Sequence, residues 1–240
     1  MNTPAPFGKI YLIPVGLGSH TKHEVLPISI QKVIEKTRHY VVENEKNARR
    51  FIKKIAPTVP QDDLRIETLN KFTTEIEASA FITPCLEGQD IGVLSDAGCP
   101  AVADPGALLV KIAHQKNIEI HPLVGPSSLL LALMGSGLNG QGFCFHGYLP
   151  VNKQDRKQQI KKMEFQSFKE NQSQIFIETP YRNEALFEDL KNILHPDTLL
   201  CVAVDLSLTT EYIKTQSISE WQKNKVKLHK RPCVFIIHKF

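Results

Sequence analysis

The residues best suited to do chemistry lie where short apolar segments give way to turns. Residues 91–105, IGVLSDAGCPAVADP, begin as a strand-forming segment and continue into a turn that contains Gly98 and Pro100. Gly98 can adopt a positive φ and Pro100 cannot donate to a β-ladder, so the strand is expected to end there. Asp104 directly before Pro105 is typical of an N-cap and first helical position, which predicts a helix after this loop.

Asp96 opens that loop at the carboxyl end of the predicted strand. Open α/β sheets bind ligands in loops at this end of their strands, so the Asp96 carboxylate is a candidate contact for a hydroxyl or a charged group. An Asx turn, in which the carboxylate only bonds nearby backbone, explains the residue equally well.

A glycine turn, PVGLGS, follows the first predicted strand at residues 14–19. It lacks the third glycine of the G-x-G-x-x-G dinucleotide fingerprint, and Pro27 delays the next helix, so it does not predict a pyrophosphate site. The chain also has no G-x-x-x-x-G-K-[ST] phosphate loop. What remains is either a turn of small residues that lets a ligand approach the backbone or an ordinary strand-ending turn.

A third loop, PLVGPSS, occupies residues 122–128 and ends in Ser127 and Ser128, where another helix is expected to begin. These serines offer hydroxyls and backbone amides to an acceptor, although taken alone they indicate only a helix N-cap. Three such loops at neighbouring strand ends favour a pocket with convergent polar groups.

The composition is that of a folded, soluble globular protein. The 240 residues are 42% hydrophobic and 22% charged, with a net charge of +4. No apolar run is long enough to span a bilayer, and the first residues do not resemble a secretory signal, so we expect a cytoplasmic protein without a membrane partner. The five cysteines include no C-x-x-C pair, which argues against a disulfide framework or a structural zinc site.

Three stretches concentrate the positive charge. They are a predicted helix with Lys46, Arg49, Arg50, Lys53 and Lys54, another with Lys153, Arg156, Lys157, Lys161 and Lys162, and the segment 223–231. A solvated helix face explains each stretch taken alone. If the stretches converge in space, they favour an RNA-binding surface whose affinity falls with salt.

Strands and helices are expected to alternate through the first part of the chain. The predicted strands there are residues 9–15, 39–43, 65–68, 91–95 and 118–124, and the predicted helices are 28–36, 45–55, 74–86, 107–115 and 128–134. This pattern favours an α/β fold with a largely parallel sheet covered on both faces.

A glycine-rich stretch at 135–142 interrupts the alternation, and the segment around Leu149 is typical of a linker. Further strands are expected at 143–147, 174–178, 199–205, 212–215 and 233–238, with helices at 155–169 and 182–194 and a short helix near Trp221. We therefore expect two α/β domains, an amino-terminal one at residues 1–148 and a carboxyl-terminal one at residues 149–240.

Five motifs in this order, PVGLGS, SDAGCP, LVGPSS, FCFHGYLP and IFIETPYR, resemble those of the tetrapyrrole methylase superfamily of S-adenosylmethionine-dependent methyltransferases. The similarity extends from about Lys9 to Phe240. Within the superfamily, the pattern is most similar to the ribosomal RNA small subunit methyltransferase I group, which methylates a ribose 2′-hydroxyl of 16S ribosomal RNA. The resemblance implies a mostly parallel first sheet, a mixed second sheet, a cleft between the domains that holds the methyl donor, and a homodimer.

The resemblance also implies which residues contact S-adenosylmethionine. In the first domain they are Gly16, Leu17, Gly18, Ser19, Asp96, Gly98, Cys99, Pro100, Ser127 and Ser128, and in the second they are Glu178, Val204 and Cys233. Cys99 replaces the threonine of the family motif, which exchanges a hydroxyl for a weak thiol donor.

A second departure concerns the acceptor. Ribosomal members resemble E-D-T-R after the second strand, whereas this chain has Glu43-Asn44-Glu45-Lys46. Lys cannot reproduce the planar, bidentate contacts of Arg, so an acceptor contact made there would change.

Methyl transfer from a sulfonium is an in-line displacement, so an enzyme contributes mainly alignment and desolvation. A ribose hydroxyl has a high pKa, and a nearby base would assist its attack. Glu43, Asp96 and Glu178 are the candidate catalytic residues, and His146 is a further candidate base. A carboxylate that favours the start of a helix explains Glu43 equally well.

Arg49, Arg50 and Arg182 are the candidate acceptor-binding residues, because guanidinium groups suit phosphate and carboxylate. A surface ion pair at a helix start explains Arg182 equally well. Cys144 and His146 form a C-x-H arrangement, but packing along a strand explains it better than a metal site.

Two classes of function therefore stay open. One is a methyltransferase acting on RNA, with a tetrapyrrole or another small acceptor as a variant. The other is a catalytically silent RNA-binding module with the same fold. The intact Asp96 loop and the serine pair favour the enzyme.

Overall fold

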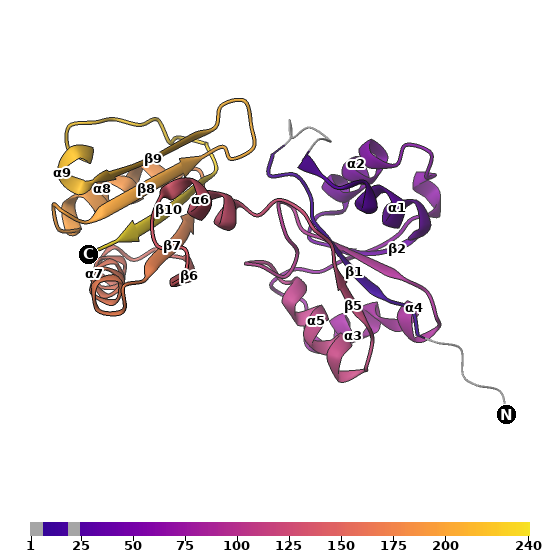
Figure 1. Cartoon of the computed structure of the whole chain (residues 1–240). Helices are drawn as coiled ribbons and strands as arrows, with labels where there is room; N and C mark the ends of the chain where they lie inside the picture. Colours follow the sequence, from indigo (N-terminus) through magenta and orange to yellow (C-terminus); the bar gives the residue numbers. More distant parts are fainter. Residues whose placement is uncertain (1–6, 19–24) are drawn as a thin grey trace. The chain divides into compact units, whose positions relative to one another are not determined.

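The chain folds into two compact units, Met1–Ser127 and Ser128–Phe240, in a computed structural model that describes residues 7–18 and 25–240. Each unit has its own sheet with helices packed against it (Figure 1). The architecture of two α/β domains is thus confirmed.

The sheet of the first unit contains five parallel strands in the order β3-β2-β4-β1-β5. The strands are β1 (Ile10–Ile13), β2 (His39–Val42), β3 (Arg65–Thr68), β4 (Ile91–Leu94) and β5 (Ile120–Pro122). Because they run in one direction, their carboxyl ends meet at one edge of the sheet, and the predicted parallel sheet is confirmed.

Helices cover both faces of this sheet (Figure 1). α1 (Ile28–Lys36) and α2 (Glu45–Ile55) lie on one face, whereas α3 (Glu75–Phe81), α4 (Thr83–Leu86) and α5 (Gly106–Gln115) lie on the other. Side chains alternate between the faces along each strand, so Leu12 packs toward α3 and α5 and Ile13 toward α1 and α2.

The single helix predicted at 74–86 is divided into α3 and α4. Pro84 has no N–H for a continuing helix, which accounts for the break just before it. A short 3₁₀ helix at Gln61–Asp63 was not predicted.

The connections of β1 and β4 create a switch point in the first sheet. These strands are neighbours, yet the chain leaves β1 toward β2 and leaves β4 toward β5, in opposite directions across the sheet. Open α/β sheets bind ligands outside the carboxyl ends of strands at such a point. The sheet topology therefore directs attention to the loops after β1 and β4.

The second unit contains a mixed sheet in the order β6-β7-β10-β8-β9. Its strands are β6 (Phe143–Tyr148), β7 (Ser173–Glu178), β8 (Leu199–Val204), β9 (Tyr212–Ser217) and β10 (Cys233–His238). β6 and β7 are parallel and the other pairs are antiparallel, so the predicted mixed sheet is confirmed. The helices are α6 (Ser128–Ser136), α7 (Lys153–Glu170), α8 (Asn183–Ile193) and α9 (Ile218–Trp221).

The division between the units falls earlier than the boundary expected at residues 148 and 149. α6 packs on β8, β9 and β10, and β6 pairs with β7, so residues 128–148 are built into the second unit. The glycine-rich stretch at 135–142 connects two elements of that unit and does not separate domains.

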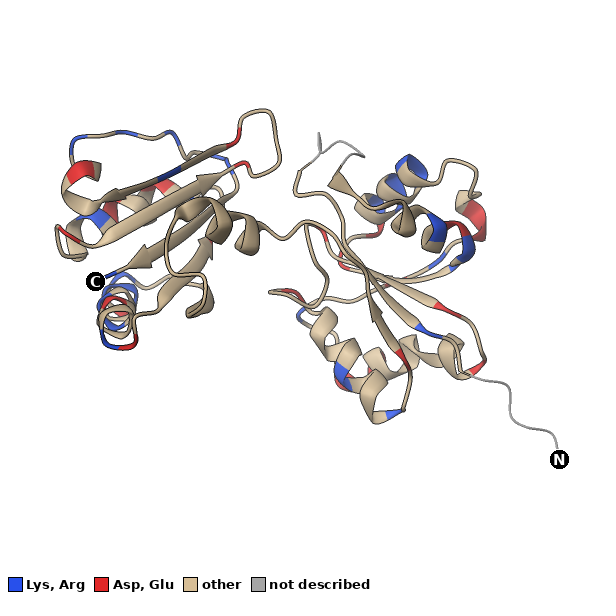
Figure 2. Ribbon diagram, in the orientation of Figure 1, with Lys and Arg blue, Asp and Glu red and all other residues tan. Residues whose placement is uncertain are grey.

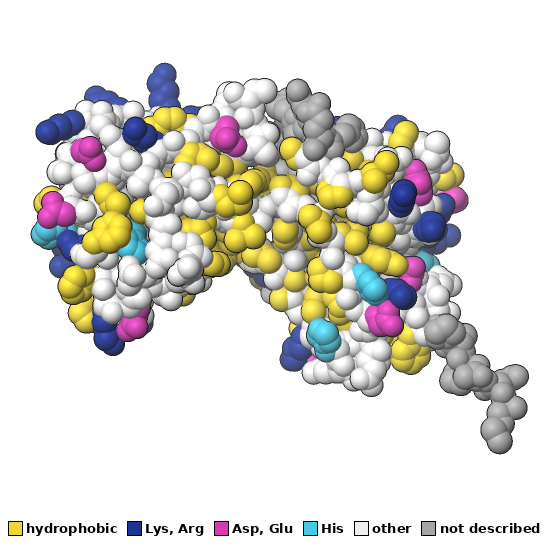
Figure 3. Space-filling view, viewed as in Figure 1, with side chains coloured by type: hydrophobic (Ala, Val, Ile, Leu, Met, Phe, Trp, Pro, Cys, Tyr) yellow, Lys and Arg dark blue, Asp and Glu magenta, His cyan; other side chains and the backbone are white. Residues whose placement is uncertain are grey.

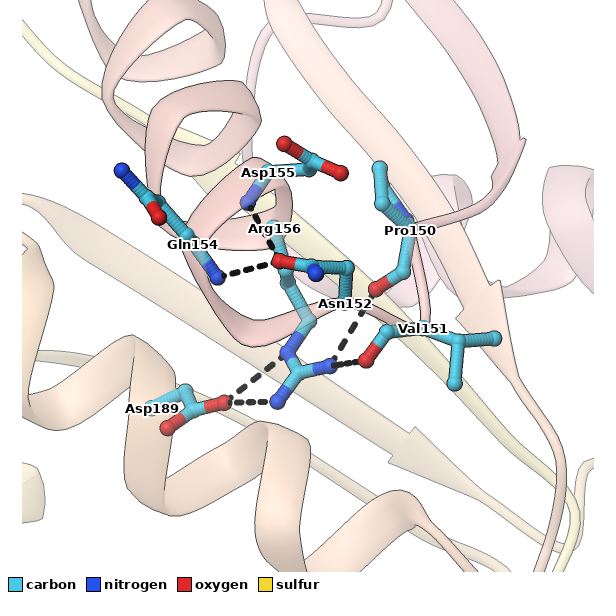
Figure 4. Close-up of polar contacts among 7 residues, drawn as sticks. All are labelled: Pro150, Val151, Asn152, Gln154, Asp155, Arg156 and Asp189. Atoms are coloured by element: carbon cyan, nitrogen blue, oxygen red, sulfur yellow. Dashed lines mark hydrogen bonds and ion pairs between the residues drawn. The ribbon is translucent and has the colours of Figure 1, made fainter.

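The start of α7 is held by a polar cluster (Figure 4). The Asn152 side chain accepts hydrogen bonds from the first-turn amides of Gln154 and Asp155, at 2.9 and 3.2 Å. Arg156 donates from Nε and Nη2 to Asp189 Oδ2 on α8, at 2.9 and 2.6 Å, and from Nη1 to two backbone carbonyls. Arg156 therefore joins α7 to α8.

Replacing Arg156 with Met removes the guanidinium and leaves the Asp189 carboxylate, which is only 16% exposed, without its partner. We expect the free energy of unfolding of the second unit to fall by about 1–3 kcal/mol. Urea unfolding monitored by the fluorescence of the buried Trp221 measures this change. Lys157→Met is the control, with a change within about 0.5 kcal/mol. Equal stability of the two variants would contradict the role of Arg156.

Candidate functional site

Three loops at the carboxyl edge of the first sheet contact one another directly. The Val15 amide after β1 donates to Gly98 O after β4 at 2.9 Å, and Cys99 Sγ donates to Pro126 O after β5 at 3.5 Å. A Cβ added at Gly125 would lie only 2.2 Å from Pro14 Cβ, so these two loops are also in close contact. The three loops singled out in the sequence are therefore brought together within the first unit.

Gly98 is the point where the three loops meet. Its φ is +72°, a conformation that L side chains rarely adopt. A Cβ there would lie 3.2 Å from Leu17 Cδ2 and 3.4 Å from Pro126 O. Both the backbone conformation and the available space therefore favour glycine at this position.

The remainder of the loop after β4 is organised by Asp104. Its carboxylate accepts from Ala101 N at 2.9 Å and from Gly106 N at 2.7 Å, while Ala101 and Ala103 have positive φ angles of 67° and 61°. α5 begins at Gly106 and its N-cap residue is Pro105, so Asp104 precedes the N-cap and is not the N-cap itself as predicted. Non-glycine residues in this conformation cost energy and concentrate at functional sites.

Asp96 is exposed and fixed from two sides. Its Oδ1 accepts from Asn47 Nδ2 at 3.0 Å, and its backbone amide donates to Glu43 Oε1 at 2.9 Å. Glu43 follows β2 and Asn47 lies in the first turn of α2, where its amide is capped by Asn44 Oδ1 at 3.1 Å. Asn44, the first of three positions where this chain departs from E-D-T-R, is thus the N-cap that starts α2.

Burial raises the pKa of the Glu43 carboxyl, because the charged form loses water, and the nearby Asp104 and Asp96 raise it further. The hydrogen bond from the Asp96 amide opposes this shift in pKa. Burial also raises the pKa of Asp104, against the hydrogen bonds from Gly106 and Ala101. The contact of Glu43 with this loop is its hydrogen bond to the Asp96 amide.

A pocket of about 260 Å³ opens beside these loops. Its polar and small lining residues are Gly16, Gly18, Asn47, Ala48, Arg50, Lys54, Ser95, Asp96 and Ala97, and the rest of the lining is apolar, from Val15, Leu17, Leu26, Phe51 and Ile55. Ser19, predicted to belong to the same turn, lies outside the described residues. The pocket thus combines a glycine turn, an exposed carboxylate and cations from α2. These groups suit a ligand that carries both positive and negative groups.

The two arginines of α2 differ in their contacts. Arg49 donates to Glu45 Oε1 at 2.8 Å and to Gln61 O at 2.7 Å, which ties it to its own helix and the following loop. Arg50 is exposed and lines the pocket. Of these two arginines, both predicted to bind the acceptor, only Arg50 lines the pocket.

Ser127 and Ser128 lie where the two units join along the chain. Ser127 is the last residue of the first unit, and Ser128 is the first residue of α6 in the second. Both side chains are half-buried. Ser127 follows directly on Pro126, which contacts the Cys99 thiol, so the serine pair continues the third loop of the cluster.

The three residues predicted in the second unit are neighbours in its sheet. Cys233 pairs with Glu178 on β7 and with Val204 on β8. The side chains of Val204 and Cys233 are buried in the core, where burial raises the pKa of the Cys233 thiol. Any contact that these two residues make with a ligand would therefore use their backbone.

Glu178 is buried and engaged. Its Oε1 accepts from Thr179 N and from Arg182 Nη2, both at 2.6 Å. The carboxylate is only 2% exposed, whereas the Arg182 side chain is 36% exposed. Glu178 therefore orients the Arg182 side chain. The ion pair considered for Arg182 in the sequence analysis is formed, and its acidic partner, Glu178, is buried.

His146 and Cys144 lie along β6, and His146 Nε2 is 2.6 Å from Gln174 Oε1 on β7. Within residues 7–18 and 25–240, no three His, Cys, Asp or Glu side chains are grouped so that they could hold a metal ion. In the same ranges, no helix has both the length and the apolar character needed to cross a membrane.

Comparison with known families agrees with the motifs. Residues 9–222 match the family model of Tetrapyrrole (Corrin/Porphyrin) Methylases. The chain therefore belongs to the tetrapyrrole methylase family, and the resemblance inferred from its motifs is confirmed.

Curated relatives named Ribosomal RNA small subunit methyltransferase I are similar in sequence. The protein of Escherichia coli O157:H7 is 30% identical over 176 residues, which is 72% of this chain and 60% of that protein. The Synechocystis protein is 31% identical over 205 residues, 83% of this chain and 67% of that protein. The protein of Buchnera aphidicola (Schizaphis graminum) is 32% identical over 173 residues, 71% of this chain and 59% of its own length.

The chain spans only 59% and 60% of the length of the Buchnera and Escherichia relatives. Among solved structures, the methyltransferase CobJ has a TM-score of 0.65 at 15% identity, covering 97% of this chain and 94% of that one. Uroporphyrin-III C-methyl transferase of Thermus thermophilus, complexed with S-adenyl homocysteine, has a TM-score of 0.58 at 15% identity, with coverages of 97% and 98%. These two likenesses show a shared fold.

The raised pKa of Glu43 makes a testable prediction. The folded protein binds the proton of the Glu43 carboxyl more tightly than the unfolded chain does. The contribution of Glu43 to the free energy of unfolding therefore falls as the pH rises from 4.5 through the raised pKa. In an NMR titration, the Asp96 amide resonance should shift with a midpoint above pH 4.5.

Glu43→Gln keeps an acceptor oxygen and removes the charge. The step in the Asp96 amide titration that has its midpoint above pH 4.5 should then disappear, and the variant should gain stability relative to the wild type as the pH rises through the same window. A midpoint at or below 4.5 in the wild type would show that the carboxylate is not held as described.

Proposed function

We propose that this chain is an S-adenosylmethionine-dependent methyltransferase that methylates a ribose 2′-hydroxyl of small-subunit ribosomal RNA. The observation that carries the proposal is the meeting of three strand-end loops around Gly98, with the exposed Asp96 carboxylate beside a glycine turn. Family membership and relatives named as small-subunit RNA methyltransferases support the choice of reaction and acceptor.

The residues of the first unit fit the proposed donor. Gly16 and Gly18 let a ligand approach the backbone, and Asp96 offers a carboxylate oxygen to a hydroxyl or amino group, since only Oδ1 is engaged by Asn47. Bound S-adenosylmethionine would supply an electrophilic methyl group on a sulfonium. In the proposed assignment, Cys99, Pro100, Ser127 and Ser128 extend this binding surface.

Alignment is the main contribution that these residues can make to an in-line displacement. Glu43 accepts from the Asp96 amide and Asn47 donates to the Asp96 carboxylate, so we assign them positioning roles. Asp96 itself is the acid that stays exposed, whereas Glu178 is occupied by Arg182. Among the three proposed acids, Asp96 is therefore the one placed to contact a reactant.

Cations near the pocket support a polyanionic acceptor. Arg50 lines the pocket that Asp96 also lines, and the Arg182 side chain in the second unit is 36% exposed. Either group can pair with an RNA phosphate. The first basic stretch lies in the first unit and the other two lie in the second, and Figure 2 marks Lys and Arg positions in blue along the ribbon of both units.

The proposal includes a cytoplasmic homodimer. The five cysteines are free thiols, which is typical of a reducing compartment. Dimerisation is proposed from the family resemblance.

A tetrapyrrole acceptor is the second candidate, because structural neighbours include a methyltransferase named for uroporphyrin-III. The exposed cation at Arg50 suits either acceptor, since tetrapyrroles such as uroporphyrin carry carboxylates. The sequence similarity to ribosomal RNA methyltransferases favours RNA.

Transfer of labelled methyl groups from S-adenosylmethionine separates the two acceptors. We expect label in unmodified 16S ribosomal RNA or small subunits, in a dinucleotide that resists alkaline cleavage, because a 2′-O-methyl group removes the nucleophile of that cleavage. Asp96→Ala should lower the rate by about 100-fold, the size of effect that misalignment causes.

Asp62→Ala is the matched control, because Asp62 is an exposed acid in the 3₁₀ helix of the same unit and lies outside the pocket. Label that enters a tetrapyrrole and no RNA would overturn the choice of acceptor. Equal rates for Asp96→Ala and the wild type would overturn the site.

A further inference from the structure

α7 exposes a face that carries lysines and two phenylalanines and, between residues 157 and 169, no exposed acidic residue. Between residues 157 and 169, the exposed side chains are Lys157, Gln158, Lys161, Lys162, Phe165, Phe168 and Lys169. Phe165 is 64% exposed and Phe168 is 61% exposed, and their spacing of three residues places the two rings on the same side of the helix. In Figure 3, hydrophobic side chains lie among Lys and Arg over this part of the second unit.

Helical spacing places these residues together. Lys157, Lys161, Phe165 and Phe168 follow one another at intervals of four, four and three residues, which puts them on one side of a helix. The opposite side carries Ile160, Met163 and Ser167, all buried in the second unit. The orientation of α7 is therefore determined by its core contacts, and the lysine and phenylalanine face points to solvent.

The acids of α7 in this region are engaged elsewhere. Glu164 accepts from His195 N at 2.8 Å and from the Thr198 hydroxyl, and Glu170 pairs with Lys169 at 3.2 Å. Arg156, which belongs to the same basic stretch, is bound to Asp189. Lys157, Lys161 and Lys162 have no ion-pair partner among the described residues, so three ammonium groups are available for an external anion.

The chemistry of this face selects a partner. Protein interfaces are depleted of lysine at their centre, so four lysines around two rings do not suit a protein partner. Single-stranded nucleic acid offers phosphates for the ammonium groups and bases that stack on exposed aromatic rings. Protein recognition of unpaired RNA uses this combination.

We propose that the exposed face of α7, from Lys157 to Lys169, is a binding platform for single-stranded RNA, with Phe165 and Phe168 stacking on bases and Lys157 and Lys161 pairing with phosphates. This inference rests on the proposed RNA acceptor. It assigns the second unit the task of holding an unpaired segment of that RNA outside the Asp96 site.

Fluorescence anisotropy with an unstructured RNA of about 12 nucleotides, a length within known single-strand site sizes, tests the platform over a series of KCl concentrations. Phe165→Ala/Phe168→Ala should weaken binding at least about tenfold while the salt dependence stays. Lys157→Ala/Lys161→Ala should lower the slope of log affinity against log salt by about 1.4, the value for two phosphate contacts on a single strand.

Two matched controls are available in the first unit. Lys32→Ala/Lys36→Ala removes two exposed lysines at the same spacing on α1, and Phe72→Ala removes a phenylalanine that is 80% exposed. Both should bind like the wild type. Circular dichroism of each variant confirms that it is folded.

The outcomes separate this inference from the proposed function. If both α7 variants bound RNA with wild-type affinity, the proposed RNA platform on α7 would be overturned. RNA methylation by the wild-type protein would still support the proposed function. Loss of a dimer in Phe165→Ala/Phe168→Ala, with RNA affinity unchanged, would identify the face as a contact between copies and would also overturn it. Absence of salt-sensitive RNA binding by the wild type would overturn the RNA acceptor itself.

Discussion

The candidate site depends on one constraint, the close packing of three loops at the carboxyl edge of a parallel sheet. Because β1, β4 and β5 run side by side in one direction, the loops that follow them must share a small space. Gly98 is where they touch, and its positive φ and missing side chain make the contact possible. Asp96 is then held in place by Glu43, which follows β2, and by Asn47, which lies in α2.

The parts of the fold that follow from local patterns could be predicted from the sequence. The alternation of apolar strands with amphipathic helices predicted the parallel sheet. The turn residues around Asp96 and Gly98 indicated that the loop after β4 is a candidate ligand contact. The division between the units could not be found in this way, because the segment around Leu149 looks like a linker, whereas β6, which precedes it, already pairs with β7 in the second unit. That pairing is a tertiary contact with no local signal.

The roles of individual polar residues were harder to predict for the same reason. Asn47 was not expected at the site, since its contact with Asp96 joins residues 49 positions apart and the sequence around it indicates only a helix start. Glu178 is a candidate acid by position, but the side chain of Arg182 occupies it. Arg49 and Arg50 are neighbours in sequence, and only the helical turn decides that one binds Gln61 and the other lines the pocket.

The central claim is that the loops after β1, β4 and β5 form one ligand surface. A titration of ¹⁵N-labelled protein with S-adenosylhomocysteine tests it most directly. We expect the amide resonances of Gly16, Asp96, Gly98 and Ser127 to move together along a single saturating curve. Saturable binding that leaves these amides unchanged, or an absence of saturable binding, would contradict the account.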